Sequence, residues 1–190
     1  VITLEKNGDN FDVVIPSRSL REFTSVFSDD IETVEVFFAN NQILFRSEHI
    51  SFYTRLLEGN YPDTDRLIPT EFNTEATFNV ANLRFAMERA RLLSNATQNG
   101  TVKLEFKNGV VSSHVHSPEV GRVNEEIDTS AVSGEDLSIS FNPTYLIEAL
   151  KAIDSEQVVI RFISSVRPFT LVPEGNEQGF IQLITPVRTN

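Results

Sequence analysis

Three segments of this 190-residue chain share one pattern at a constant spacing. Each segment begins with a short apolar run, passes through Ser, Asn or Pro, and continues with helical periodicity. Leu20, Leu83 and Leu146 take the same place in the three segments, so the spacing is 63 residues both times. Because a fixed spacing of this length indicates a repeated folding unit, we expect a fold built from three copies of one unit.

The helical part of each segment is apolar on one face only. Within 17–28, 79–95 and 142–153 the apolar side chains recur three and four residues apart, as in helices that pack on a sheet. Short oxygen-bearing side chains near each start can accept hydrogen bonds from exposed backbone N–H groups. We therefore expect N-caps at Ser17, at Asn79 or Asn82, and at Asn142, with Pro143 in the first helical position.

Three strand-like runs follow each expected helix. They span 33–38, 42–46 and 50–57 in the first repeat, 101–106, 110–116 and 120–127 in the second, and 157–163, 168–172 and 180–187 in the third. Asn40-Asn41 and Asn108-Gly109 separate neighbouring runs and have the composition of tight hairpin turns. The sequence therefore predicts an α+β fold of three strand–helix–three-strand repeats.

Composition excludes several classes of protein. The chain has no cysteine, which rules out a disulfide framework, a thiolate metal site and a cysteine nucleophile. No apolar run approaches the roughly 18 residues of a membrane span, so we expect a soluble, intracellular protein. The formal net charge of −11 argues against a protein that binds nucleic acid over its whole surface.

The charges are unevenly distributed along the chain. The three expected helices sum to +3, and the remaining residues sum to −14. One interpretation is that the basic residues lie on ordinary solvated helix faces. The other is that they form a basic surface that faces phosphates, inside a protein that is otherwise acidic. The basic residues that would face DNA in the second case are Arg18, Arg21, Arg84, Arg91 and Lys151.

Signals of catalysis are weak. No glycine-rich phosphate loop and no Gly-x-Ser-x-Gly turn is present. His114 and His116 place two imidazoles on one face of a strand near Glu119, but no further ligand stands at a recognised spacing. We therefore expect no catalytic residue, no cofactor and no metal. A metal-dependent hydrolase that uses these histidines stays open as an alternative, as does a plain protein-interaction scaffold.

The C-terminal run is apolar almost to its last residue, although chain ends are usually polar and frayed. Such a run forms a core or edge strand in most cases. A second possible role is to line a groove for a partner peptide, in which a few apolar anchors supply most of the binding energy.

Four stretches resemble motifs of one family. FYTRLLEGNYPD at 52–63 is similar to the segment that closes the middle domain of the bacterial DNA polymerase III β subunit, the DNA sliding clamp. RARLLSN at 89–95, FNPTYL at 141–146 and TPVR at 185–188 resemble motifs of the third domain, in the same order. The resemblance implies the DNA-clamp fold, with helices on one face of antiparallel sheets.

The resemblance also implies a domain organisation. Clamp subunits have three domains of two repeats each, and two subunits close head to tail into a ring around duplex DNA. Residues 1–68 would be the second half of the middle domain and 69–190 the complete third domain, so the chain would be a fragment. Leu92, Leu93 and the edge of strand 120–127 would form the ring interface with a domain that this chain lacks.

The function implied by the resemblance is that of a processivity factor of the replicative polymerase, which is not an enzyme. The full-length homodimer would encircle double-stranded DNA without sequence specificity, in the bacterial cytoplasm near the nucleoid and away from membranes. Polymerases, the clamp loader and repair proteins would insert a linear motif into a peptide pocket. The residues implied for this pocket are Pro62, Arg66, Leu67, Asn142, Tyr145, Val166, Pro168, Leu183, Ile184, Thr185, Pro186, Val187 and Arg188.

Overall fold

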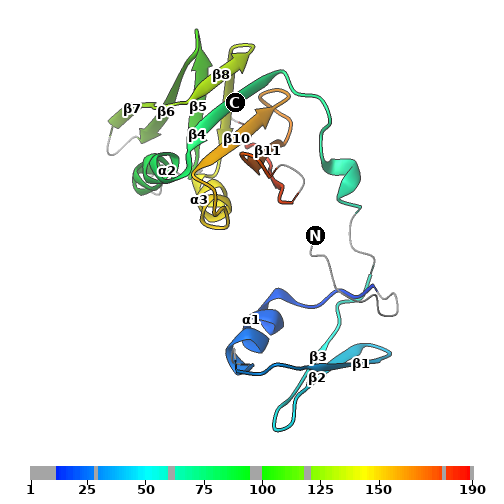
Figure 1. Cartoon of the computed structure of the whole chain (residues 1–190). Coiled ribbons are helices and arrows are strands. Elements are labelled where there is room, and N and C mark those ends of the chain that lie inside the picture. The colour runs from blue at the N-terminus through cyan, green and yellow to red at the C-terminus, as the bar shows by residue number, and fades with distance from the viewer. Residues whose placement is uncertain are drawn as a thin grey trace. The chain divides into compact units, whose positions relative to one another are not determined.

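A computed structural model describes residues 12–27, 30–59, 63–94, 100–117, 121–176 and 179–188. The chain divides into two compact units, Ile2–Asp63 and Thr64–Asn190 (Figure 1), which are taken one at a time below. Within the described residues, no helix is long and apolar enough to cross a membrane.

The N-terminal unit contains one helix and one antiparallel sheet. The helix α1 spans Ser17–Val26, and the strands β1 (Glu35–Ala39), β2 (Gln42–Arg46) and β3 (Ser51–Arg55) follow in sheet order β1-β2-β3. Each strand pairs with the next along the chain, so the sheet is a simple meander. All four elements lie within or close to the ranges that the periodicity predicts.

Aromatic side chains hold α1 on its sheet. The ring of Phe23 lies 4.6 Å from that of Phe45 and 6.2 Å from that of Phe52, measured between centroids. The hydroxyl groups of Ser19 and Thr54 are hydrogen-bonded at 2.8 Å. Nevertheless, no residue of α1 is fully buried, so this helix is covered on one side only by the described residues.

The C-terminal unit contains two repeats. Its elements are η1 (Asp65–Leu67), β4 (Thr74–Asn79), α2 (Val80–Ser94), β5 (Val102–Lys107), β6 (Val110–Ser117), β7 (Gly121–Ile127), β8 (Ala131–Gly134), β9 (Leu137–Phe141), α3 (Pro143–Lys151), β10 (Gln157–Phe162), β11 (Phe169–Pro173) and β12 (Gln182–Ile184). They form a five-stranded sheet in order β12-β11-β10-β4-β8 and a four-stranded sheet in order β7-β6-β5-β9.

The two repeats exchange their first strands. β4, which precedes α2, pairs antiparallel with β10 of the other repeat, and β9, which precedes α3, pairs antiparallel with β5. The short strand β8 was not expected from the sequence, and it extends the sheet on the free side of β4. Periodicity could not reveal the exchange, because a strand with alternating side chains buries the same face whether it pairs with a strand of its own repeat or of the other repeat.

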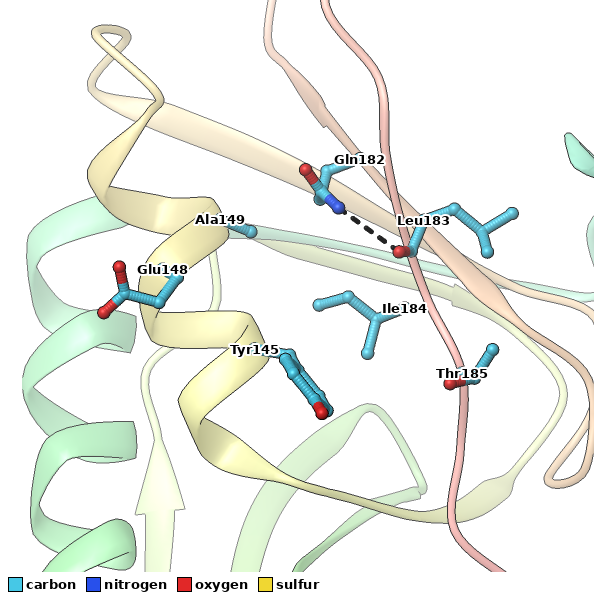
Figure 2. A pocket seen from close by; sticks show the side chains of 7 residues that line it. All are labelled: Tyr145, Glu148, Ala149, Gln182, Leu183, Ile184 and Thr185. Atoms are coloured by element: carbon cyan, nitrogen blue, oxygen red, sulfur yellow. Dashed lines mark hydrogen bonds between the residues drawn. The ribbon is translucent and has the colours of Figure 1, made fainter. Parts of the chain in front are cut away.

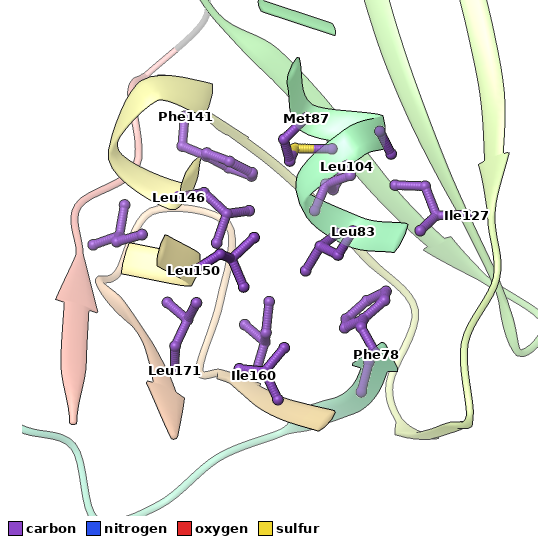
Figure 3. Packing of buried hydrophobic residues seen from close by; sticks show 14 of the residues in the cluster. Phe78, Leu83, Met87, Leu104, Ile127, Phe141, Leu146, Leu150, Ile160 and Leu171 are labelled. Atoms are coloured by element: carbon purple, nitrogen blue, oxygen red, sulfur yellow. The ribbon is translucent and has the colours of Figure 1, made fainter. Parts of the chain in front are cut away.

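The core of this unit lies between the sheets and the two helices (Figure 3). Leu83 on α2 and Leu146 on α3, which are equivalent in the repeat, are fully buried. Phe78 and Phe141, the equivalent residues of the two exchanged strands, are fully buried as well. The one-sided apolar stripes of both expected helices are therefore confirmed as core faces.

The helix starts agree with the sequence at two of three places. Asn79 Oδ1 accepts a hydrogen bond from the Asn82 N–H at 3.1 Å, and Asn142 Oδ1 accepts one from the Thr144 N–H at 2.9 Å. The expectation for Ser17 is wrong: this residue is already helical, and the N-cap of α1 is Pro16, which offers no side-chain acceptor.

Candidate functional site

A cavity of about 370 Å³ lies between α3 and β12 (Figure 2). Its walls come from two elements that are more than thirty residues apart in the sequence and lie side by side in the C-terminal unit. The lining residues are Tyr145, Glu148, Ala149, Gln182, Leu183, Ile184 and Thr185.

The helical wall follows from the spacing of three residues. Tyr145, Glu148 and Ala149 stand at positions i, i+3 and i+4 of α3 and therefore share one helix face. The adjoining face of α3 is anchored in the core by Leu146 and Leu150. Tyr145 keeps 61% of its surface exposed, so its ring forms a rim that is open to a partner.

The strand wall is an edge of the five-stranded sheet. β12 pairs with β11 on one side, with Ile184 opposite Phe169, and no described strand pairs along its other side. Ile184 is almost fully buried and supplies an apolar floor, whereas Leu183 is half-buried. The Gln182 Nε2 amide donates a hydrogen bond to the Leu183 carbonyl oxygen at 3.3 Å, which holds this side chain along the strand.

One ionised carboxylate stands at the rim. The Lys151 Nζ ammonium donates a hydrogen bond to Glu148 Oε1 at 2.9 Å. This hydrogen bond, together with the positive charges of Lys151 and Arg91, lowers the pKa of Glu148 below its ordinary value. The lining holds no nucleophile next to a base and no second carboxylate, so the geometry favours binding apolar side chains over acid–base chemistry.

The structure gathers four of the residues that the sequence analysis assigned to the peptide pocket. Tyr145, Leu183, Ile184 and Thr185 all line the cavity. Sequence reasoning missed Glu148 and Ala149, although helical spacing from Tyr145 would have indicated them. It also missed Gln182, which directly precedes the assigned terminal run and whose side chain folds back along it.

The other assigned pocket residues lie outside this lining. Asn142 caps α3, and the Val187 N–H donates a hydrogen bond to the Ser140 carbonyl oxygen at 2.7 Å. Val166 and Pro168 precede β11, Arg66 and Leu67 belong to η1, and Pro186 and Arg188 follow Thr185 along the chain. Pro62 falls outside the described residues.

Two of the assigned arginines lie close to acids of their own helix, and two do not. Arg18 pairs with Glu22 at 3.0 Å, and Arg84 Nε lies 3.8 Å from Glu88 Oε1. Arg21 is exposed. Arg91 is half-buried on α2, and its Nε atom has no hydrogen-bond partner among the described residues. The positive charge of the helices is thus partly neutralised locally.

The assigned ring-interface residues differ in exposure. Leu92, in the last turn of α2, is 71% exposed, whereas Leu93 is half-buried and packs against the core. β7 forms the outer edge of the four-stranded sheet. Arg89 of α2 is hydrogen-bonded to Glu125 of β7, and this bond raises the pKa of the Arg89 guanidinium.

The histidines of the hydrolase alternative are engaged in the sheet. The two ring nitrogens of His114 lie 2.8 Å from Asn124 Oδ1 and 2.9 Å from Ser112 Oγ. His116 stands opposite Arg122 across the β6–β7 pair, a position that disfavours a cation. Glu119 lies outside the described residues, and the part of the chain that the structure describes has no cluster of three metal-binding side chains.

Comparison with solved structures identifies the architecture. The Streptococcus pneumoniae DNA polymerase III beta chain superposes with a TM-score of 0.94 at 80% identity, over 99% of this chain and 50% of that chain. The Bacillus subtilis sliding clamp gives a TM-score of 0.85 at 38% identity, over 95% and 47%. The protein therefore has the DNA-clamp fold, with helices on one face of antiparallel sheets.

Comparison of sequences then identifies the family. The C-terminal domain of the DNA polymerase III beta subunit matches residues 65–188, and the central domain matches residues 2–63. The chain belongs to the DNA polymerase III beta subunit family. The beta sliding clamp of S. pneumoniae serotype 4 is 80% identical over 189 residues, and that of Lactococcus lactis is 53% identical over 192. The chain spans about half the length of these curated relatives, 50% in both cases.

Proposed function

We propose that this chain acts as part of a DNA sliding clamp, the processivity factor of a replicative polymerase. The cavity between α3 and β12 is the docking site for short linear motifs of polymerases, the clamp loader and repair proteins. The observation that carries the proposal is an apolar floor beside an open sheet edge, rimmed by the exposed ring of Tyr145. An extended peptide can place apolar anchors on such a floor and its backbone along such an edge.

In this function, residues 1–68 are the second half of the central domain and 69–190 the complete C-terminal domain. The family matches at 2–63 and 65–188, and the division of contacts after Asp63, support this assignment. The family resemblance also implies a role in peptide binding for residues that do not line the cavity: Pro62, Arg66, Leu67, Asn142, Val166, Pro168, Pro186, Val187 and Arg188.

DNA is held loosely and without sequence readout. Arg18, Arg21, Arg84, Arg91 and Lys151 lie on helices and face the duplex inside the ring. Because each phosphate contact releases counterions, this attraction is salt-dependent, and acids such as Glu22 and Glu88 close to the basic groups keep it weak enough for sliding. The whole protein is a homodimeric ring closed by Leu92 and Leu93, without catalytic activity or cofactor, in the bacterial cytoplasm near the nucleoid.

A peptide titration tests the docking site. The chain is titrated into a fluorescently labelled peptide with two or three apolar anchors, and binding is followed by fluorescence anisotropy. Tyr145→Ala is expected to weaken binding at least about tenfold, because exposed aromatic anchors dominate such interfaces. Phe85→Ala is the matched control, since Phe85 is an exposed aromatic residue on α2 away from the cavity lining. Equal affinities for wild type and Tyr145→Ala, with unchanged circular dichroism, would reject the docking site.

A further inference from the structure

The strand wall of the docking cavity is a sheet edge without charged side chains. Residues 180–187, which include β12, contain no Asp, Glu, Lys or Arg. The outer edge of the other sheet, β7, carries Arg122, Glu125 and Glu126, and charged side chains of this kind keep an exposed edge from pairing with other chains. No described strand pairs along the outer side of β12, so this edge needs a different protection.

The side chain of Gln182 provides such a protection. Its Nε2 amide donates a hydrogen bond to the Leu183 carbonyl oxygen at 3.3 Å, on the side of β12 that faces α3 (Figure 2). A backbone carbonyl at a sheet edge takes its donor from water, from a side chain or from an added strand. The Gln182 amide therefore occupies an acceptor that an extended peptide in the cavity would otherwise use.

This hydrogen bond can be exchanged without movement of the backbone. Its donor–acceptor distance of 3.3 Å is longer than the usual value of about 2.9 to 3.0 Å, so the bond is weak. The backbone beneath it is held on β11 by pairing, and beyond β12 the Val187 N–H donates a hydrogen bond to the Ser140 carbonyl oxygen at 2.7 Å. Rotation of one side chain is therefore enough to free the Leu183 oxygen.

We propose that Gln182 is a displaceable cap on the docking site. In the free protein its amide satisfies the Leu183 carbonyl oxygen, and a docking peptide donates one backbone N–H to that oxygen in its place. This inference rests on the proposed docking function, and it adds a residue that limits the affinity of the site. It also selects the partner, because a proline at the donating position has no N–H and cannot replace the Gln182 amide.

The occupant is a peptide segment because the edge and the cavity lie side by side. β12 offers only three residues, Gln182–Ile184, to an added strand, which gives few backbone hydrogen bonds by itself. A peptide on this edge also places side chains on the buried Ile184 and against Tyr145 in the adjoining cavity. Apolar anchors of this kind supply most of the energy of such complexes, and the backbone bond adds to it.

Removal of the cap tests the proposal. Gln182→Leu keeps a side chain of similar size that cannot donate, and it is expected to bind the labelled peptide about two- to tenfold more tightly than wild type, the effect of one net hydrogen bond. Gln157→Leu is the matched control, since Gln157 is a half-buried glutamine of the same sheet outside the cavity lining. Equal or weaker binding by Gln182→Leu overturns the cap.

The same titration separates failure of the cap from failure of the docking site. If Tyr145→Ala weakens binding and Gln182→Leu does not strengthen it, the docking site stands and the cap is rejected. If the peptide binds neither wild type nor Gln182→Leu, both proposals are rejected.

Methylation of the peptide backbone distinguishes the cap from an apolar contact made by the new leucine. A series of peptides carries one N-methylated residue each. At one position, methylation is expected to weaken binding to wild type and to remove the difference between wild type and Gln182→Leu, because the peptide can no longer donate to Leu183. A difference that persists with every methylated peptide overturns the proposal.

The cap can also be observed directly in the labelled wild-type chain. On addition of saturating peptide, the NMR signal of the Gln182 side-chain amide is expected to shift, since its acceptor is taken, whereas the signal of the Gln157 amide is expected to stay in place. An unchanged Gln182 signal in the saturated complex overturns the displacement.

Discussion

The environment of a leucine differs sharply between two helices of the C-terminal unit. Leu146 sits in the core below α3, whereas Leu92 projects from the last turn of α2 into solvent. The two side chains are chemically identical and both stand on helices of one unit. Any difference in their contribution to stability therefore comes from packing and burial alone.

We predict that Leu146→Ala destabilises the C-terminal unit by about 2 to 5 kcal/mol, because removing a buried leucine loses transfer free energy and leaves a cavity. Leu92→Ala is expected to change stability by less than about 0.5 kcal/mol. Urea denaturation followed by circular dichroism measures both. Similar midpoints for the two variants would contradict the assigned core.

The rim carboxylate should titrate below its ordinary range. Lys151 lowers the pKa of Glu148 through a hydrogen bond, so the charged pair supports the fold above that ordinary pKa, and its contribution is lost as pH falls through the lowered value. Carbon-detected NMR titration should place the Glu148 midpoint below that of an unpaired glutamate, and Lys151→Met should raise it. A midpoint that does not respond to Lys151→Met would show that the pair is not formed in solution.

At the scale of elements, α3 depends on a defined start. Asn142 accepts the Thr144 N–H, and Pro143 follows in the first turn, where a missing N–H costs nothing. The same start orients Tyr145 toward the strand wall of the cavity. The N-cap residue Asn142 thus helps to position the helical wall of the docking site.

We predict that Asn142→Ala costs about 1 kcal/mol in unfolding free energy, because a helix N–H loses its acceptor. Asn142→Asp should retain most of the stability, since its carboxylate can accept the same bond and lies favourably at a helix N-terminus. Thermal unfolding of the three proteins distinguishes this role. Equal losses in both variants would indicate that the amide acts through another contact.

At the scale of the whole molecule, the two units have unequal cores. The C-terminal unit buries a continuous cluster that involves both helices and both sheets, whereas Phe27 and Ile43 are the buried apolar residues of the described N-terminal unit. The single repeat therefore has much less apolar burial with which to offset its conformational entropy.

We predict that amide hydrogens of β1, β2 and β3 exchange much faster in dilute solution than those of β4, β5 and β10. Local opening requires less free energy where few apolar contacts are lost. Hydrogen exchange with mass spectrometry measures this difference in the intact chain. Protection that is uniform across the two units would contradict the unequal cores.

Local sequence patterns predicted most of the helices and strands. The spacing of 63 residues and the one-sided stripes located all three helices, and Asn142 and Pro143 marked the start of α3. These features depend on side-chain periodicity and on backbone hydrogen bonds within a few residues. Ser17 failed as a cap because the chain enters α1 one residue earlier, through a proline that the local pattern did not single out.

The residues of the pocket were likewise predicted only in part from local sequence. Tyr145 and the terminal run were assigned from motif resemblance, but only the tertiary structure joined them to Glu148, Ala149 and Gln182 around one cavity.

The sequence by itself determined that one strand–helix–three-strand unit occurs three times. Only the tertiary structure decided which repeats exchange their first strands, since these pairings join residues from 31 apart (Phe106 and Leu137) to 88 apart (Thr74 and Phe162) and leave no local trace in the alternation of side chains. It also decided that Leu83 and Leu146 are buried while Leu20 is not. Burial is a property of what packs against a residue, and equivalent sequence positions become different environments when only two of the three repeats have a neighbour within the chain's described structure.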